Sequence, residues 1–332
     1  MTVRVFYDQD VDPGALASET VAVLGYGIQG RAQALTLRDS GVRVVVGNRE
    51  DRYRDAARED GFDVLDVKSA VARSTIALVL LPDEAQPEIY ASEIAPGLEK
   101  GNAVVFAHGF SVHYGRVRVS PDVDLLLLAP RMPGPFLRER YLAGFGIPAF
   151  VDVARDASGR AWPRLLGLAG ALGITRCGAL QATFSQETEL DLFSEHFTYP
   201  LLFRALEQAF EMLAAEGYPE ELALMELHGS EEIGEVLLAA ARRGIAGMLA
   251  EHASPACQAG IAHHWERALP EESLARARAA LEEIRSGRFA EHLLSEAERG
   301  YPELSRWKAE RPERLASAEA RLRALLKRPS GR

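Results

Sequence analysis

Short runs of β-branched residues and leucine recur along the first half of the chain. They cover residues 21–24, 42–46, 76–81, 103–107, 125–129 and 149–153. The segments between the early runs, such as 31–40 and 52–59, carry charged residues at helical spacing. An alternation of buried strands with amphipathic helices is typical of α/β domains. The pattern therefore predicts a parallel sheet that helices cover on both faces.

The pattern of apolar residues changes after Gly178. Strand-like runs disappear, and apolar residues follow three- and four-residue spacing in 187–217, 219–243, 271–286 and 309–327. This spacing indicates amphipathic helices. We therefore expect two domains, an α/β domain over residues 1–181 and an all-α domain over residues 182–328. The basic tail that ends at residue 332 is expected to form a frayed terminus.

Composition excludes several classes of protein. The chain has 332 residues, and its net charge of −10, without a basic run before the tail, argues against a nucleic-acid partner. Its longest apolar runs fall far short of the ~18 to 20 residues of a membrane span, and the amino terminus lacks a secretion signal. We therefore expect a cytoplasmic protein with no membrane partner. Cys177 and Cys257 form no metal or disulfide pattern, and we expect both to be buried apolar residues.

A glycine-rich motif follows the first apolar run and opens a helical segment. It reads Gly25-Tyr26-Gly27-Ile28-Gln29-Gly30. Gly25 permits a tight turn, Gly27 lets the backbone approach a pyrophosphate, and Gly30 allows a helix to pack closely on a strand. In this context the motif predicts a Rossmann domain that binds a nicotinamide dinucleotide. The alternative is that the glycines only shape a turn.

The loop after the second predicted strand bears on the choice of cofactor. Asn48 stands where enzymes that use NAD carry an acidic residue for the ribose hydroxyls. Arg49 and Arg52 can instead pair with a 2′-phosphate, which favours NADP(H). Glu50 and Asp51 would repel that phosphate unless they point away. The alternative interpretation is a solvated charged loop.

Further segments along nearly the whole chain carry a family resemblance. They are Phe6-Tyr7-Asp8, Leu37-Arg38-Asp39-Ser40-Gly41, Leu80-Leu81-Pro82-Asp83-Glu84, Phe106-Ala107-His108-Gly109-Phe110, His113-Tyr114-Gly115, Ala129-Pro130, Gly146-Ile147-Pro148 and Glu187-Thr188-Glu189-Leu190-Asp191-Leu192-Phe193-Ser194-Glu195. Together with the glycine motif they resemble the ketol-acid reductoisomerase family of branched-chain amino acid biosynthesis, in its short (class I) form. The last segment is the most specific.

The resemblance implies a fold, a reaction and a partner. It implies an α/β Rossmann domain followed by an all-α, knotted C-terminal domain, in homodimers whose helical domains interlock to complete each active site. Enzymes of the family use two magnesium ions to assist an alkyl migration in a 2-hydroxy-2-alkyl-3-keto acid, and then reduce the resulting 2-keto acid with a nicotinamide hydride. We expect the cofactor to contact Gly25, Tyr26, Gly27, Ile28, Gln29, Gly30, Asn48, Arg49, Arg52, Leu81, Pro82, Asp83, His108 and Gly134.

Two acidic residues and a histidine are the first candidates for catalysis. Asp191 and Glu195 are spaced i, i+4 on a predicted helix, and oxygen ligands at that spacing suit Mg²⁺. Spacing alone favours a solvated acidic face, whereas the resemblance matches both positions to magnesium carboxylates. His108 follows a buried strand at the edge where parallel sheets bind ligands, and the resemblance implies that it handles a proton during hydride transfer. His113 is interpreted as structural.

Several positions depart from the family pattern. Arg131 stands where the family has a lysine that organises the metal-bridged substrate oxygens, and a guanidinium is planar and never donates its proton at neutral pH. The family's serine-rich substrate segment is replaced by residues 251–257, in which either Ala253 marks a lost hydroxyl or Ser254 supplies it from a shifted backbone.

The second pair of metal carboxylates, which a partner subunit supplies as Glu-x-x-x-Glu, is also changed. Counting from the preceding glycine gives Glu226 with Ser230, and counting back from the following glycine gives His228 with Glu232. The two counts disagree by two residues, which indicates an insertion, so we choose Glu226 and Glu232 as candidate ligands beside Asp191 and Glu195. The imidazole of His228 is a softer ligand than Mg²⁺ favours.

Three functions are compatible with these residues. We favour an NADPH-dependent oxidoreductase of the family that reduces a small keto acid, ketone or imine with reduced or lost isomerase activity, using His108, Arg131, Asp191 and Glu195. The alternative is an authentic Mg²⁺-dependent ketol-acid reductoisomerase that acts on 2-acetolactate in valine and isoleucine biosynthesis. A non-enzymatic nucleotide sensor is the third, but a sensor has little reason to keep these acidic residues and the histidine together.

Overall fold

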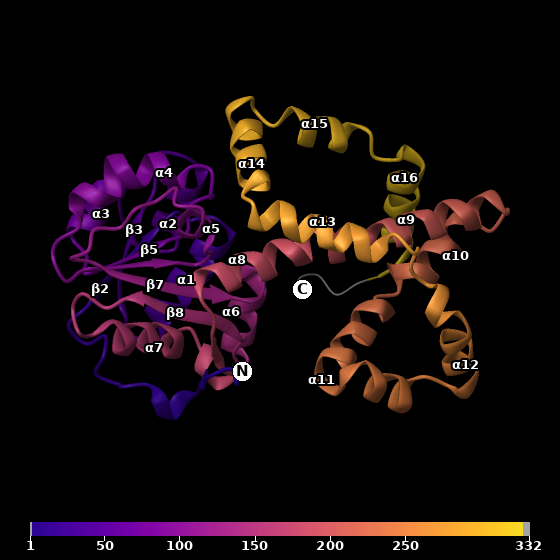
Figure 1. The fold of residues 1–332 in the computed structure, drawn as a ribbon, viewed down its shortest axis with the longest axis horizontal. Coiled ribbons are helices and arrows are strands. Elements are labelled where there is room, and N and C mark those ends of the chain that lie inside the picture. The colour runs from indigo at the N-terminus through magenta and orange to yellow at the C-terminus, as the bar shows by residue number, and fades with distance from the viewer. Residues whose placement is uncertain (1, 328–332) are drawn as a thin grey trace. The chain divides into compact units, whose positions relative to one another are not determined.

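The computed structural model describes residues 2–327, which form two compact units (Figure 1). The units divide between Asp191 and Leu192. The boundary expected from the sequence, after residue 181, lies earlier in the chain. Most of the helix α8 (Phe184–Phe193) therefore belongs to the first unit and not to the second. The predicted frayed tail lies outside the described residues from position 328 onward. Within the described part of the chain, every helix is too short or too polar to cross a bilayer.

The first unit is built on one nine-stranded sheet with the order β1-β9-β8-β7-β6-β5-β2-β3-β4. The strands are β1 (Val5–Phe6), β2 (Thr20–Leu24), β3 (Arg43–Gly47), β4 (Asp63–Leu65), β5 (Ile76–Val79), β6 (Ala103–Phe106), β7 (Asp124–Pro130), β8 (Ala149–Arg155) and β9 (Ala179–Gln181). Strands β2 to β7 are mutually parallel, β8 is antiparallel to β7, and β1 is antiparallel to β9.

The prediction of a parallel sheet is wrong for its last run, because β8 pairs antiparallel with β7. After β7 the chain enters α6 (Gly134–Leu142), which packs against α1 (Ile28–Asp39). The contact begins at Gly134, where a Cβ would lie 2.2 Å from the carbonyl oxygen of Ile28. β8 begins at Ala149, which pairs with Pro130 at the end of β7, so the chain enters β8 from the carboxyl ends of the parallel strands. The sequence did not predict β1, β4 and β9, since strands this short carry no periodicity.

Helices cover both faces of the sheet, and successive strand residues alternate between two apolar cores. Val21 and Val23 face the core beneath α1, α2 (Arg52–Glu59) and α7 (Ala161–Ala171). Ala22 and Leu24 face the core beneath α3 (Val67–Ala72) and the π-helical turn η2 (Tyr90–Ile94). Figure 1 shows α3 and α7 on opposite faces. Burial on both faces explains why the strands are continuous apolar runs. The other helices of this unit are α4 (Gln86–Ile89), α5 (Phe110–His113), η1 (Asp8–Asp10), η3 (Ala95–Gly97) and η4 (Ile174–Arg176).

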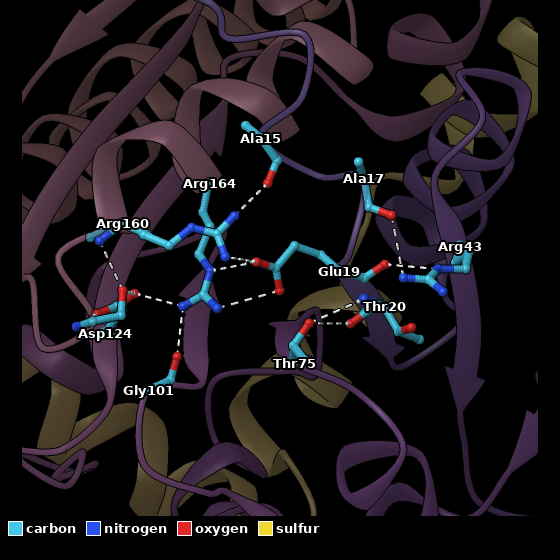
Figure 2. Close-up of polar contacts among 12 residues, drawn as sticks. Ala15, Ala17, Glu19, Thr20, Arg43, Thr75, Gly101, Asp124, Arg160 and Arg164 are labelled. Carbon is cyan, nitrogen blue, oxygen red and sulfur yellow. Dashed lines mark hydrogen bonds and ion pairs between the residues drawn. The ribbon is translucent and has the colours of Figure 1, made fainter.

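A buried ion network joins α7 to the amino ends of the parallel strands, which we call the amino edge (Figure 2). Nε of Arg164 donates to Glu19 at 3.0 Å, and its Nη1 donates to Asp124 at 3.0 Å and to the carbonyl oxygen of Gly101 at 2.6 Å. Arg160 pairs with the same oxygen of Glu19 at 3.2 Å. The side chains of Glu19 and Asp124 are 2% and 0% exposed. Arg164, Glu19 and Asp124 thus connect helix and sheet out of reach of solvent, while the side chain of Arg160 is 47% exposed.

The second unit is helical, as the sequence predicted. Its elements are the π-helical turn η5 (Ser194–Thr198), α9 (Tyr199–Ala215), α10 (Glu220–Leu224), the π-helical turn η6 (Met225–Gly229), α11 (Glu232–His252), α12 (Pro255–His264), η7 (Trp265–Arg267), α13 (Ser273–Arg285), α14 (Arg288–Glu298), α15 (Pro302–Ala309) and α16 (Glu313–Leu325). A core that includes Phe210, Leu224 and Leu322 joins α9, α10 and α16. Gly244 interrupts α11 at φ 75° and ψ 160°.

The expectation that both cysteines are buried is wrong. Cys177 and Cys257 are exposed free thiols. Cys177 follows the turn η4, and Cys257 lies in the first turn of α12, whose Ser254 cap accepts its backbone N–H. Both therefore lie where an element begins or ends, and composition alone does not reveal that position.

Candidate active site

The glycine motif lies at the carboxyl end of β2, where the sequence placed it. Gly25 has φ 92°, and a Cβ on Gly30 would lie 1.9 Å from the carbonyl oxygen of Gly25. Gly27 caps α1, and among the described residues no heavy atom comes within 4 Å of the Cβ that an alanine would add there. The turn is therefore tight at its two ends and open at Gly27, beside the helix N-terminus. An open backbone at that point is what a pyrophosphate requires.

Several of the expected cofactor residues gather around this turn. The backbone N–H of Tyr26 donates to Oδ1 of Asn48 at 3.0 Å, and the side chain of Gln29 donates to the β7–α6 loop at 2.9 Å. The side chain of Ile28 is 69% exposed. The Tyr26 side chain is buried, and its hydroxyl donates to Asp60; burial raises the pKa of that hydroxyl well above its usual value. Only the backbone of Tyr26 therefore faces a ligand.

The loop after β3 holds its acidic residues in local ion pairs. Asp51 caps α2 by accepting the backbone N–H groups of Tyr53 and Arg54, and it pairs with Arg49 at 3.0 Å. Burial alone would raise the pKa of the Asp51 carboxyl, but its hydrogen bonds from Arg49, Arg54, Tyr53 and Asn48 lower it overall. Asp51 is thereby committed to its own loop as a charged cap.

The neighbouring charges of this loop are arranged in the same way. Glu50 pairs with Arg54 at 3.0 Å and with Arg58 at 3.7 Å. The side chain of Arg49 is 85% exposed, and Arg52 lies over the ring of Tyr53 with its Cζ 4.8 Å from the centroid. Both acidic residues have arginine partners, while two arginines remain at the surface.

The loop after β5 lies beside the glycine motif. A Cβ on Gly25 would lie 2.8 Å from the carbonyl oxygen of Leu80. The side chain of Gln86 donates to the carbonyl oxygen of Leu81 at 2.8 Å and to Asp83 at 3.1 Å, across Pro82. The other carboxylate oxygen of Asp83 lies 2.8 Å from Nδ1 of His108. A carboxylate accepts, so this contact assigns the Nδ1 proton and turns Nε2 away from Asp83.

Four charged or titratable side chains meet at the carboxyl ends of the parallel strands, which we call the carboxyl edge. Nη1 of Arg131 donates to Glu187 at 2.9 Å, and its Nη2 pairs with Asp191. Nε2 of His108 lies 3.6 Å from the other oxygen of Asp191. The side chains of Arg131, Asp191 and His108 are 28%, 23% and 21% exposed, whereas Glu187 is 1% exposed. Three of these four residues were predicted from the sequence.

Glu187 was not predicted, although a signal for it exists. It lies four residues before Asp191, so both carboxylates project from one face of α8. Its second oxygen accepts the backbone N–H of Gly109 at 2.7 Å. A Cβ on Gly109 would lie 2.6 Å from the carbonyl oxygen of Phe184 and 2.5 Å from Oγ1 of Thr188. Glycine at this position therefore allows α8 to cross the carboxyl edge next to His108.

The donor set of this cluster suits a divalent cation. One ligand atom from each of His108, Glu187 and Asp191 lies within 4.8 Å of the others, and in residues 2–327 this is the one such group of three. Two carboxylates are the hard oxygen donors that Mg²⁺ prefers. The guanidinium of Arg131 contacts both carboxylates, so it already provides one positive charge there.

The other expected metal ligands belong to the second unit. Glu195 lies in η5, where it lines a cavity of about 1420 Å³ within the second unit. Glu226 lies in the π-helical turn η6, and Glu232 begins α11 after Glu231, whose φ is 70°. The two candidate ligands thus lie on different elements, with a break between them. Within the described residues neither joins a group of three ligands.

Comparisons with known proteins identify the family of this chain. The family model "Acetohydroxy acid isomeroreductase, NADPH-binding domain" matches residues 15–178, and "Ketol-acid reductoisomerase, C-terminal domain" matches residues 184–328. The ketol-acid reductoisomerase (NADP(+)) of Pyrobaculum neutrophilum is 39% identical over 305 residues, which cover 91% of this chain and 92% of that protein. The one of Methanocaldococcus jannaschii is 38% identical over 306 residues, with the same coverage.

A solved structure gives the same result. An NADH-preferring ketol-acid reductoisomerase from an uncultured archaeon superposes with a TM-score of 0.92 at 36% identity, covering 98% of this chain and 100% of that one. The family matches extend over both units, and the relatives align over nearly their whole length. The chain belongs to the ketol-acid reductoisomerase family, and its curated relatives are oxidoreductases.

Proposed function

We propose that this protein is an NADPH-dependent oxidoreductase that reduces a small 2-keto acid or a related ketone or imine, with alkyl migration weaker than reduction. The observation that carries the proposal is the position of Arg131, which bridges Glu187 and Asp191 at the carboxyl edge. Reduction needs one electrophile beside an oriented nicotinamide, whereas migration needs two metal ions that polarise adjacent oxygens. A fixed guanidinium suits the first requirement better than the second.

The cofactor proposal rests on the glycine motif and on the loop after β3. NADPH would lie over the open backbone at Gly27, with its pyrophosphate at the N-terminus of α1. Arg49 and Arg52 are exposed and would meet the 2′-phosphate. Glu50 is paired with Arg54, and Asp51 pairs with Nε of Arg49, so Arg49 would reach the phosphate with its terminal nitrogens. When bound, the nicotinamide supplies the hydride.

The residues of the cluster would have different roles in proton transfer, charge stabilisation and metal binding. Asp83 fixes the Nδ1 proton of His108, so Nε2 faces the cluster and would exchange a proton with the product oxygen through water. Arg131 would stabilise the negative charge that develops on that oxygen, or hold the substrate carboxylate. Mg²⁺ bound by Asp191 and Glu187 would polarise the substrate oxygens.

A complete ketol-acid reductoisomerase is the second candidate. Two observations favour it: His108, Glu187 and Asp191 form one metal-binding group, and the named relatives are about 39% identical over nine-tenths of the chain. Ser254 caps α12, where its hydroxyl accepts the backbone N–H of Cys257 at 3.2 Å. Its own O–H is left to donate to a carboxylate, so this contact is compatible with both candidates.

We also propose that the protein is a homodimer whose second unit pairs with another copy. Large apolar side chains stay exposed around the cavity of this unit: Phe203, Leu237 and Trp307 are 62%, 51% and 57% exposed. An obligate interface above about 2,000 Å² would cover them. Sedimentation at micromolar concentration tests the proposal, and a stable monomer would contradict it. A cytoplasmic location stays a prediction of the sequence.

The test of function compares two substrates. 2-Acetolactate must rearrange before it is reduced, whereas 3-hydroxy-3-methyl-2-ketobutyrate needs only reduction. We expect faster NADPH oxidation with the second compound, with a part of that rate surviving removal of Mg²⁺ by a chelator. Robust, strictly Mg²⁺-dependent turnover of 2-acetolactate would reject our proposal in favour of the second candidate. NADPH binding without turnover of either compound would identify a sensor.

A further inference from the structure

Every carboxylate oxygen of Glu187 and Asp191 faces a contact within the cluster. One oxygen of Glu187 accepts from Arg131 and the other from the backbone N–H of Gly109. One oxygen of Asp191 pairs with Arg131, and the other lies 3.6 Å from Nε2 of His108. The guanidinium also lies over the ring of Phe150, with its Cζ 5.3 Å from the centroid. A cation that coordinates both oxygens of Asp191 therefore has to displace the Arg131 guanidinium, whereas the oxygen that faces His108 lies beyond hydrogen-bond distance of Nε2 and leaves room for a ligand.

Arginine makes that displacement harder than lysine would. A guanidinium keeps its charge at any accessible pH, and its planar fork engages two carboxylates at once. An ammonium is a point charge on a flexible stem, so it leaves a carboxylate by rotating its side chain. Two cations that share one partly buried carboxylate repel each other strongly, because the medium screens them less than water does.

We propose that the Arg131 guanidinium and a divalent cation are alternative partners of the Asp191 carboxylate, so that Arg131 acts as a built-in competitor of the metal. Asp191 is the shared ligand because it is 23% exposed, whereas Glu187 is 1% exposed and held by Gly109. The competition is independent of which substrate the enzyme uses, and it goes beyond the reaction proposed above. It accounts for a metal-binding geometry in a site that already contains the positive charge of Arg131.

The test is a titration of the full-length protein with Mn²⁺, without cofactor or substrate, followed by the electron paramagnetic resonance signal of the free ion. The key variant is Arg131→Met, which removes the charge and keeps the length of the side chain. We expect it to bind Mn²⁺ at least about tenfold more tightly than the wild type, since a repelling charge is lost. Arg131→Lys should lie between the two.

The matched control is Arg138→Met. Arg138 pairs with Asp39 from α6, and its side chain is 20% exposed, so the substitution removes a comparable ion pair and the same net charge outside the cluster. We expect no change in Mn²⁺ affinity. An equal gain in this control would show that net charge, and not competition, sets the affinity, and would overturn the proposal.

Asp191→Asn identifies the ligand. Combined with Arg131→Met, it should abolish the gain in affinity, and unchanged binding would show that Mn²⁺ occupies another site, against the proposal. Arg131→Met binding Mn²⁺ no more tightly than the wild type would also overturn it, because the arginine would then support the metal. If Arg131→Met does not fold, as judged by circular dichroism, Arg131→Lys alone decides, with tighter binding expected and equal or weaker binding contradictory.

Discussion

At each edge of the sheet an arginine bridges two carboxylates, but the two arginines differ in their exposure to solvent. At the amino edge Arg164 bridges Glu19 and Asp124, and at the carboxyl edge Arg131 bridges Glu187 and Asp191. The side chain of Arg164 is 7% exposed and that of Arg131 is 28% exposed. One arginine is sealed between a helix and the sheet, while the other borders solvent.

This difference separates a structural ion pair from a functional one. Asp124 accepts hydrogen bonds from two backbone N–H groups and from the hydroxyl of Ser158 in addition to Arg164, so its position is fully determined. Asp191 has a partly open side and a histidine at 3.6 Å, which leaves room for a ligand. Ligands of parallel sheets bind beyond the carboxyl ends of the strands, where loops have no packing role to fill.

The largest expected effect is on stability at the amino edge. Arg164→Met leaves two buried carboxylates with one fewer cation, and we expect a loss of about 3–5 kcal/mol in the free energy of unfolding. Arg131→Met should cost less, because Asp191 can gain water and only Glu187, which keeps the backbone N–H of Gly109, is left buried without its cation. Urea unfolding of both variants measures the difference. Equal losses would contradict the distinction between the two edges.

The second effect concerns cofactor binding at the carboxyl edge. Replacing Arg49 and Arg52 together by alanine should weaken NADPH binding by about 1.5–3 kcal/mol for each contact with the 2′-phosphate, and leave NADH binding unchanged. Arg58→Ala is the control, because Arg58 also pairs with Glu50 but lies farther along α2. Fluorescence titration with both cofactors is the measurement. Tighter binding of NADH than NADPH by the wild type would contradict the proposed preference.

A third effect tests the open turn. Gly27→Ala places a methyl group where the fold has space, so stability should hold while NADPH affinity falls about tenfold, or 1.4 kcal/mol. Gly30→Ala puts a Cβ against the carbonyl oxygen of Gly25 and should impair folding itself. Cofactor titration and thermal unfolding of both variants separate the two roles. Unchanged affinity in Gly27→Ala would mean that the pyrophosphate lies elsewhere.

The smallest effect is a pH dependence at His113, whose Nδ1 lies 3.1 Å from the hydroxyl of Ser185. Burial lowers the pKa of His113 below its ordinary value of 6.5, against a weaker opposing effect of Glu189. As the pH falls through 6.5 the unfolded chain takes up a proton before the folded one, so stability decreases below that pH. We expect the urea midpoint of His113→Gln to fall less between pH 7.5 and pH 5.5 than the midpoint of the wild type does. Part of the decrease in stability should remain in this variant, because burial also lowers the pKa of His196 in the second unit. An identical slope in His113→Gln would contradict the assignment.

Much of the fold could be predicted because it follows from periodicity. The runs that became β2, β3, β5, β6 and β7 are apolar on both faces, and the glycine motif has a requirement at each glycine. The direction of β8 could not be predicted, because it depends on the packing of α6 against α1. Exposure of Cys177 likewise depends on where an element ends.

The candidate site was predictable in part for a similar reason. His108 and Arg131 follow strands of the parallel set, so the topology alone brings them to one edge. Glu187 was missed although it lies four residues before Asp191, because its contacts with Arg131 and with the backbone N–H of Gly109 appear only in the fold. Glu226 and Glu232 lie in a segment with a π-helical turn and a break between helices, so i, i+4 spacing does not predict which side chains share a face there. Their role as metal ligands stays a prediction.

The most direct test of the central claim is the ratio of two rates in the wild type and in Arg131→Lys. The ratio is kcat for 2-acetolactate divided by kcat for 3-hydroxy-3-methyl-2-ketobutyrate, at saturating NADPH and Mg²⁺. If Arg131 favours reduction at the expense of metal-assisted migration, lysine should raise this ratio at least about tenfold, a difference of 1.4 kcal/mol between the two barriers. A ratio that stays the same or falls would contradict the account.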